Sequence, residues 1–197
     1  AALDAAATRH GVPAAVITAI WGMESNYGGN FGSFSAVDAL ATLAYDGRRR
    51  DWARGELLAA LRIVDRGDIA ADALVGSWAG AMGHTQFIPT TYLAYAVDVT
   101  GDGRRDIWSN DPTDALASTA SYLRQMGWRP GQPWGTEVVL PPGFDYNQTG
   151  KLVSRSASQW SAMGVRTMNG TAVPSGSILL PAGARGPAFL ITENFRA

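Results

Sequence analysis

The sequence changes character near residue 129, and this change constrains the fold more than any other feature. Before it, apolar residues recur at helical spacing; after it, proline and glycine separate short runs typical of β-strands. We predict helices over 13–25, 35–45, 50–67, 111–128 and 155–164, and strands over 137–140, 178–180 and 188–192. The pattern predicts an α+β, mainly α fold, with a helical body over 1–130 and a small β-containing lobe over 131–197.

Composition excludes several classes of protein. The 197 residues carry 16 basic and 17 acidic side chains, which gives no electrostatic footprint for nucleic acid. The chain has no cysteine, and this excludes disulfides, thiol nucleophiles and Cys-ligated zinc. No run approaches the ~18 apolar residues of a membrane span, and no signal-peptide pattern opens the chain. We interpret it as a mature or trimmed product, with any membrane anchor upstream.

A single glutamate stands near the end of the first predicted helix, in the stretch "AIWGMESNYGGNFG" (19–32). Ile17, Ile20, Trp21 and Glu24 follow the spacing i, i+3, i+4, i+7, so they share one helix face. The helix C-terminus disfavours an anion, and so does partial burial beside Trp21. Both effects raise the pKa of Glu24, as a general acid requires. The alternative is a carboxylate that turns to solvent or pairs with an arginine.

The stretch "GSWAGAMGHTQFIPTTYLAY" (76–95) joins small residues to an amide and several aromatic rings. Glycine and alanine let another chain approach the backbone closely. The Gln86 amide both donates and accepts, which suits a sugar hydroxyl or an acetamido group. The pattern therefore fits the floor of a groove for a polymer, or equally a tightly packed corner between helices. His84 receives no role from the sequence.

The stretch "DVTGDGRRDIW" (98–108) resembles a calcium-binding EF-hand loop over 98–109. The loop positions 1, 3, 5, 6, 7 and 9 are occupied by Asp98, Thr100, Asp102, Gly103, Arg104 (through its carbonyl) and Asp106. Position 12 is Ser109 where a bidentate glutamate is expected, and Asp111 or Asp114 is the candidate replacement. Calcium bound here would be structural; the alternative is a plain Asp-Gly turn.

Several stretches together, among them "IWGMESNYGG", "RRRDWARGEL", "GSWAGAMGHTQFIPTTYLAYAVDVTGDGRRDIW" and "PTDALASTASYLRQMGW", resemble the B family of bacterial lytic murein transglycosylases. The resemblance covers nearly the whole chain. It implies a lysozyme-like helical core with a small β-containing lobe. It also implies cleavage of the β-1,4 bond between N-acetylmuramic acid and N-acetylglucosamine, leaving 1,6-anhydro ends. The expected partner is the peptidoglycan glycan strand, with no cofactor needed, and the expected protein is an exported monomer of the periplasm or outer membrane.

The resemblance also assigns roles to individual residues. Glu24 matches the catalytic acid/base of the family. Residues that contact the glycan or support the acid are matched by Arg49, Ser77, Gln86, Phe87, Tyr92 and Tyr122. The family continues beyond "NFRA" with a Tyr-Asn pair and a final helix, so we expect that helix to be missing here and part of the cleft with it.

The expected mechanism uses one carboxylate. Ordinary glycosidases use two, and the other acidic residues considered, Asp38, Glu56 and Glu137, lie in different predicted elements. In the scheme that the resemblance implies, Glu24 protonates the glycosidic oxygen and then deprotonates the C6 hydroxyl of the muramic acid. Two alternatives stay open: a hydrolytic muramidase on the same fold, and a non-catalytic peptidoglycan-binding module.

Overall fold

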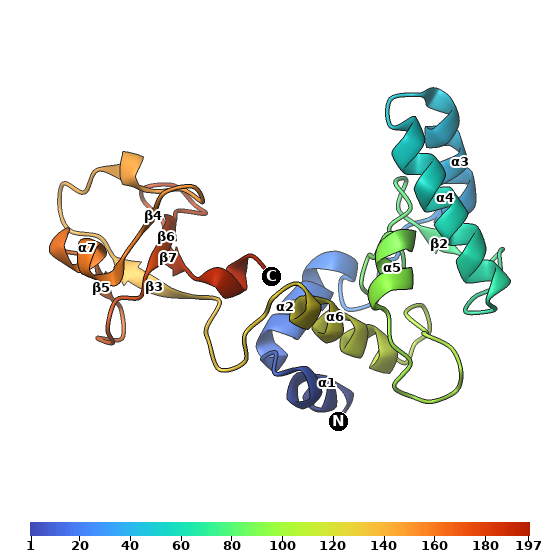
Figure 1. Ribbon diagram of the computed structural model, residues 1–197, viewed down its shortest axis with the longest axis horizontal. Coiled ribbons are helices and arrows are strands. Elements are labelled where there is room, and N and C mark those ends of the chain that lie inside the picture. Colours follow the sequence, from blue (N-terminus) through green and yellow to red (C-terminus); the bar gives the residue numbers. More distant parts are fainter. The chain divides into compact units, whose positions relative to one another are not determined.

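The computed structural model describes residues 1–197 and divides into two compact units, Ala1–Gln125 and Met126–Ala197. The assignment of 1–130 as a catalytic domain and 131–197 as a separate lobe stays a prediction. The first unit contains α1 (Ala2–His10), α2 (Ala14–Ser25), β1 (Phe34–Ser35), α3 (Ala36–Asp46), α4 (Arg50–Asp65), β2 (Val75–Gly76), α5 (Pro89–Tyr95) and α6 (Thr113–Gln125) (Figure 1). No helix in either unit has both the length and the apolar character needed to cross a membrane.

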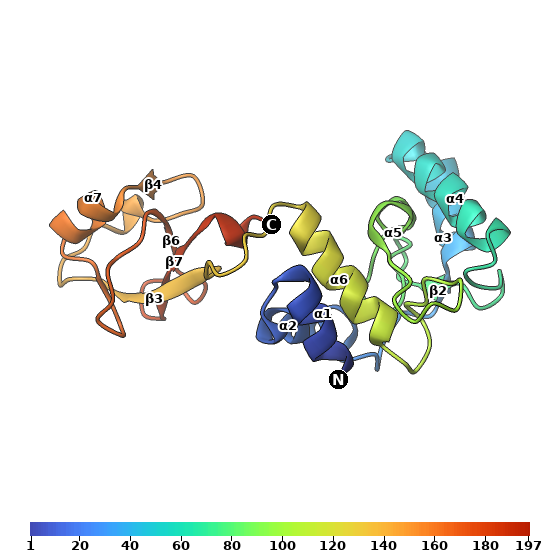
Figure 2. The same ribbon diagram turned by 60° about the horizontal axis from the view of Figure 1, so that its bottom comes forward.

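Helix α6 is the central element of the first unit. Nine of its residues are buried, from Asp114 to Leu123. It packs against α1 and α2 and also against α5 (Figure 2). A helix buried on most of its surface holds its neighbours at fixed positions, so α6 sets the place of α2, where Glu24 lies.

Local sequence signals explain where the other helices begin and end. The Ser35 hydroxyl accepts the N–H of Asp38 at the start of α3. Helix α2 ends because Asn26 takes a left-handed conformation, with φ of 50°. The predictions for α2, α3, α4 and α6 are confirmed within a few residues. Helices α1 and α5 were not predicted: α1 buries only Ala6 and so shows no apolar stripe, and α5 has only seven residues.

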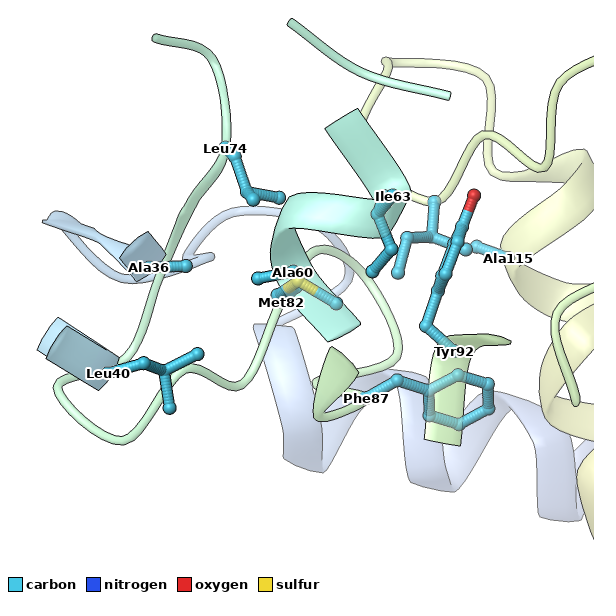
Figure 3. Packing of buried hydrophobic residues seen from close by; sticks show 10 residues of the cluster. Ala36, Leu40, Ala60, Ile63, Leu74, Met82, Phe87, Tyr92 and Ala115 are labelled. Carbon is cyan, nitrogen blue, oxygen red and sulfur yellow. The ribbon is translucent and has the colours of Figure 1, made fainter. Parts of the chain in front are cut away.

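The core of the first unit lies where α3, α4 and α5 meet a narrow antiparallel strip. Strands β1 and β2 pair with Phe34 opposite Gly76, and single bridges continue from Gly76 to Met82 and from Met82 to Phe87. Figure 3 shows Met82 and Phe87 packed with Leu40, Ile63 and Tyr92 in this core. The strip therefore links β1 and β2 to the segment that contains Phe87.

Gly83 follows this strip and is required by its backbone. Its φ is 60°, and a Cβ atom at this position would lie 2.3 Å from the carbonyl oxygen of Ile107. Only glycine permits both the conformation and the contact. The backbone at Gly83 therefore lies directly against the backbone of Ile107.

The second unit is built on a five-stranded antiparallel sheet in the order β4-β6-β7-β3-β5. Its elements are β3 (Gly135–Val139), a 3₁₀ turn (Tyr146–Gln148), β4 (Ser154–Arg155), α7 (Ala157–Ala162), β5 (Arg166–Thr167), β6 (Gly176–Leu179), β7 (Ala188–Ile191) and a 3₁₀ turn (Glu193–Phe195). Trp160 of α7 is fully buried, and its indole N–H donates to the carbonyl of Gly176 at 2.9 Å. The three longer strands and α7 confirm the prediction, whereas the two-residue strands β4 and β5 are too short to show a pattern.

Candidate active site

A groove of about 320 Å³ opens in the first unit beside the last turn of α2. Its wall consists of Ile20 and Glu24 from α2, Thr85 to Ile88 and Thr91 from the segment around the start of α5, and Thr119, Tyr122 and Leu123 from α6. Four of the predicted site residues, Glu24, Gln86, Phe87 and Tyr122, therefore meet in one hollow. The wall is mostly apolar, and its polar side chains are hydroxyls, one amide and one carboxylate.

Glu24 is the carboxylate of this groove. It is exposed on the side of the groove and takes part in no hydrogen bond or ion pair with the protein. Partial burial against the groove wall raises the pKa of its carboxyl. The C-terminus of α2 disfavours a negative charge in the same place. The side chain is therefore accessible and inclined to hold its proton, which is the state that a general acid needs.

Gln86 lines the same groove as Glu24, and the nitrogen of its side-chain amide already has hydrogen-bond partners in the protein. Its φ is 49°, and its Nε2 group donates to the carbonyl oxygens of Gly83 at 3.0 Å and Phe31 at 3.4 Å. These bonds fix the amide plane, while no bond to the protein involves Oε1. The oxygen is thus an acceptor that a hydroxyl or an N–H group of a ligand can use.

Aromatic rings form one side of the groove. The rings of Phe87 and Tyr122 lie 5.6 Å apart between centroids, and Tyr122 is also held by Tyr95 at 5.2 Å. Phe87 lines the groove but is only 8% exposed, because it also packs in the core. This stack keeps the position of Tyr122 fixed.

Tyr92, a predicted site residue, lies in the core and not in the groove wall. Its side chain is fully buried next to Ile63 and Ala115 (Figure 3), and its hydroxyl donates to the carbonyl of Arg105 at 2.7 Å. Burial raises the pKa of this hydroxyl. Tyr92 therefore cannot contact a ligand in the groove; it holds the segment around residue 105 against α5.

Two further predicted residues lie outside the groove wall. The Ser77 hydroxyl accepts the N–H groups of Ala79 at 3.3 Å and Ala81 at 3.1 Å, so it stabilises a turn. Arg49 is exposed just before α4, with its guanidinium 3.8 Å from the ring centroid of Trp52. The roles assigned to both residues stay predictions.

The sequence did not indicate the threonines of the groove. Thr85, Thr91 and Thr119 come from three different segments, so no spacing along the chain connects them. Thr119 lies one turn before Tyr122 on α6, and only the orientation of α6 places both at the groove.

No second carboxylate accompanies Glu24. The residues of the groove wall include no other acid. Glu56 is 4% exposed and accepts the N–H of Thr90 at 2.9 Å and its hydroxyl at 2.7 Å, which ties α4 to the start of α5. Asp38 lies in α3, away from this wall. The two-carboxylate arrangement of ordinary glycosidases is therefore absent from the groove.

Two carboxylates close the loop 98–109: Asp98 of the loop itself and Asp114 of α6. Asp98 accepts the N–H groups of Gly101 at 2.6 Å and Gly103 at 2.9 Å. Buried Asp114 accepts those of Val99 at 2.9 Å, Thr100 at 3.2 Å and Asp106 at 3.1 Å. The oxygen donors are of the type that calcium prefers. They are, however, turned to backbone N–H groups, and no three acidic side chains gather to hold an ion. A structural calcium ion at this loop stays a prediction.

Comparisons with known proteins give the context of this site. Residues 1–197 match the family described as Transglycosylase SLT domain. The chain is 42% identical over 150 residues to membrane-bound lytic murein transglycosylase B of Escherichia coli (strain K12), covering 73% of this chain and 41% of that protein. SltB3 from Pseudomonas aeruginosa, crystallised in complex with NAG-anhNAM-pentapeptide, is 53% identical with a TM-score of 0.91, covering 99% of this chain and 53% of that one.

A third relative is Escherichia coli lytic transglycosylase Slt35 in complex with calcium, 34% identical with a TM-score of 0.86, covering 99% of this chain and 62% of that one. This chain thus spans between 41% and 62% of the length of these relatives. The likeness confirms the predicted lysozyme-like, mainly helical α+β fold. Since the family match extends over all residues, the chain belongs to the transglycosylase SLT domain family.

Proposed function

We propose that this chain is a lytic transglycosylase that cleaves the β-1,4 bond between N-acetylmuramic acid and N-acetylglucosamine in peptidoglycan. The observation that carries the proposal is Glu24: one accessible, unpaired carboxyl with a raised pKa, alone among the acids of the groove. The amide of Gln86 and the ring of Tyr122 line the same wall and suit a sugar. The names of the relatives, and the complex of SltB3 with NAG-anhNAM-pentapeptide, support it.

In the proposed reaction, Glu24 acts twice. Its proton passes to the glycosidic oxygen as the bond from C1 to that oxygen breaks, and the N-acetylglucosamine unit leaves with a free hydroxyl. Ionised Glu24 then accepts the proton of the C6 hydroxyl of the muramic acid while that oxygen bonds to C1. The atoms balance without water: one bond is exchanged for another, and Glu24 ends protonated as it began.

The proposed partner is the peptidoglycan glycan strand, and the proposed location is the periplasm or outer membrane of a bacterium. A net charge of -1 offers no attraction to nucleic acid. We propose a monomer that needs no cofactor for the chemical step, with any membrane anchor outside this sequence.

Release of soluble fragments from purified sacculi tests the proposal against a binding module. The chain is expected to clear the turbidity of a sacculus suspension and to liberate muropeptides. Sedimentation with sacculi without any released fragment would instead establish a non-catalytic peptidoglycan-binding module.

For the loop 98–109 we propose at most a structural role for calcium. The carboxylates of Asp98 and Asp114 already accept the N–H groups that close the loop. Because these hydrogen bonds hold the loop without an ion, the midpoint of thermal unfolding should change by less than about 2 °C between excess EDTA and excess calcium. A fall of the midpoint by several degrees in EDTA would establish a calcium site.

A further inference from the structure

His84 occupies a buried position between α2 and the loop that ends at Ser109. It is 4% exposed, and both of its ring nitrogens have a partner. The indole Nε1–H of Trp21 donates to Nδ1 at 3.0 Å, and Nε2 lies 2.8 Å from the carbonyl oxygen of Ser109. An indole nitrogen can only donate, so Nδ1 must accept and Nε2 must carry the proton. One neutral tautomer thus satisfies both contacts.

The backbone around His84 is tied to the same two segments. Its carbonyl oxygen accepts the hydroxyl of Ser25 at 2.9 Å, and its N–H donates to the carbonyl of Ile107 at 2.8 Å. The ring is also enclosed: Phe31 lies 4.7 Å away edge-on, and a Cβ atom on Gly28 would come within 2.2 Å of the His84 Cε1 atom. These contacts fix the position of the His84 ring.

The two residues of α2 that His84 holds stand on either side of Glu24. Trp21 lies three residues before it, and Ser25 directly follows it in the last turn of the helix. On the other side, His84 directly precedes the segment 85–88 that forms the opposite wall of the groove. The same residue thus joins the helix that carries Glu24 to the segment that carries Gln86.

We propose that His84 is a positioning residue, which acts through Trp21 and Ser25 to hold the Glu24 carboxyl at the groove wall. The proposal rests on the proposed function for its effect on rate. Its physical basis is that a catalytic group displaced by about 1 Å can lose about 10²-fold in rate. Residues behind a catalytic group supply this precision when their own side chains are locked.

Three variants separate the two contacts of the ring. His84→Asn keeps an acceptor on Cγ, where Nδ1 stands, and loses the contact with Ser109. His84→Gln can still donate to Ser109 but has no acceptor for Trp21, and Trp21→Phe removes the donor. On soluble glycan strands, His84→Gln and Trp21→Phe should lower kcat by about 10- to 100-fold with KM little changed, while His84→Asn stays within about threefold of the wild type. The double variant Trp21→Phe with His84→Gln should lose no more than the worse single one.

A second measurement does not depend on activity. The pKa of the Glu24 carboxyl, followed by carbon-13 NMR of glutamate-labelled protein and assigned with Glu24→Gln, should fall toward the ordinary glutamate value in His84→Gln and stay raised in His84→Asn. An unchanged Glu24 titration in His84→Gln would overturn the positioning role, and so would equal losses of kcat in His84→Asn and His84→Gln. A wild-type chain that releases nothing from sacculi would overturn the proposed function instead, while the titration still decides whether His84 positions Glu24.

Discussion

Glu24→Gln is expected to abolish the release of fragments from peptidoglycan, with a loss of roughly 10³–10⁴-fold in kcat. Glutamine has the same shape but has no carboxyl proton to give to the glycosidic oxygen and cannot take the proton of the C6 hydroxyl. The groove wall contains no other acid that could replace it. Turbidity clearing and chromatography of released muropeptides measure the effect.

The fold should be unaffected by this change, because Glu24 has no partner in the protein to lose. The thermal midpoint of Glu24→Gln should match that of the wild type, and its binding to sacculi should persist. Asp38→Asn, which neutralises an exposed carboxylate of α3 outside the groove wall, serves as the matched control and should retain full activity. Residual clearing by Glu24→Gln within tenfold of the control would refute the assignment of Glu24.

The pH dependence follows from the same residue. Burial raises the pKa of Glu24 above that of an ordinary glutamate. The reaction begins with the protonated carboxyl, so kcat/KM should be maximal below this pKa and fall as the pH rises through it. An activity that instead rises as the pH is raised from acidic to neutral would contradict a general-acid role.

Asp114→Ala is expected to be the most destabilising substitution among the acids of the loop region. The change removes the acceptor of three backbone N–H groups, those of Val99, Thr100 and Asp106, at a residue that is 2% exposed. A buried N–H without a partner costs about 1–3 kcal/mol, and some of the three will find water. We expect a loss of about 3 kcal/mol in the free energy of unfolding, which corresponds to about 10 °C in the thermal midpoint.

Asp102→Ala is the matched control for this prediction. Asp102 is exposed and accepts a single N–H, that of Arg104 at 2.9 Å. Its replacement should cost about 0.5 kcal/mol or less, as is usual at a surface position. Equal and small losses in the two variants would show that the carboxylate of Asp114 does not hold the loop.

The sequence predicted the longer helices, whose apolar residues recur at helical spacing. It also placed Glu24 on the helix face that lines the groove. Helix spacing sufficed because Ile17, Ile20 and Trp21 lie on the same helix as Glu24. It could not distinguish Tyr122, which lines the groove, from Tyr92, which lies in the core, because both are aromatic residues of a recognisable motif. Only the packing of α5 against α4 and α6 separates them.

The role of His84 could not be predicted for a related reason. Its partners Trp21 and Ser109 are 63 and 25 residues away, so no local pattern joins the three. The loop 98–109 shows the opposite limit: its spacing is that of calcium ligands, but three of its backbone N–H groups donate to Asp114, which belongs to the following helix.

The most direct test of the proposed reaction is mass spectrometry of the products formed from sacculi in water labelled with oxygen-18. Transglycosylation by Glu24 closes the ring with the C6 oxygen of the sugar itself. We therefore predict that newly formed muramic acid ends are lighter than reducing ends by one water molecule and carry no label. Reducing muramic acid ends that contain oxygen-18 would show that water is the nucleophile, and the protein would then be a muramidase.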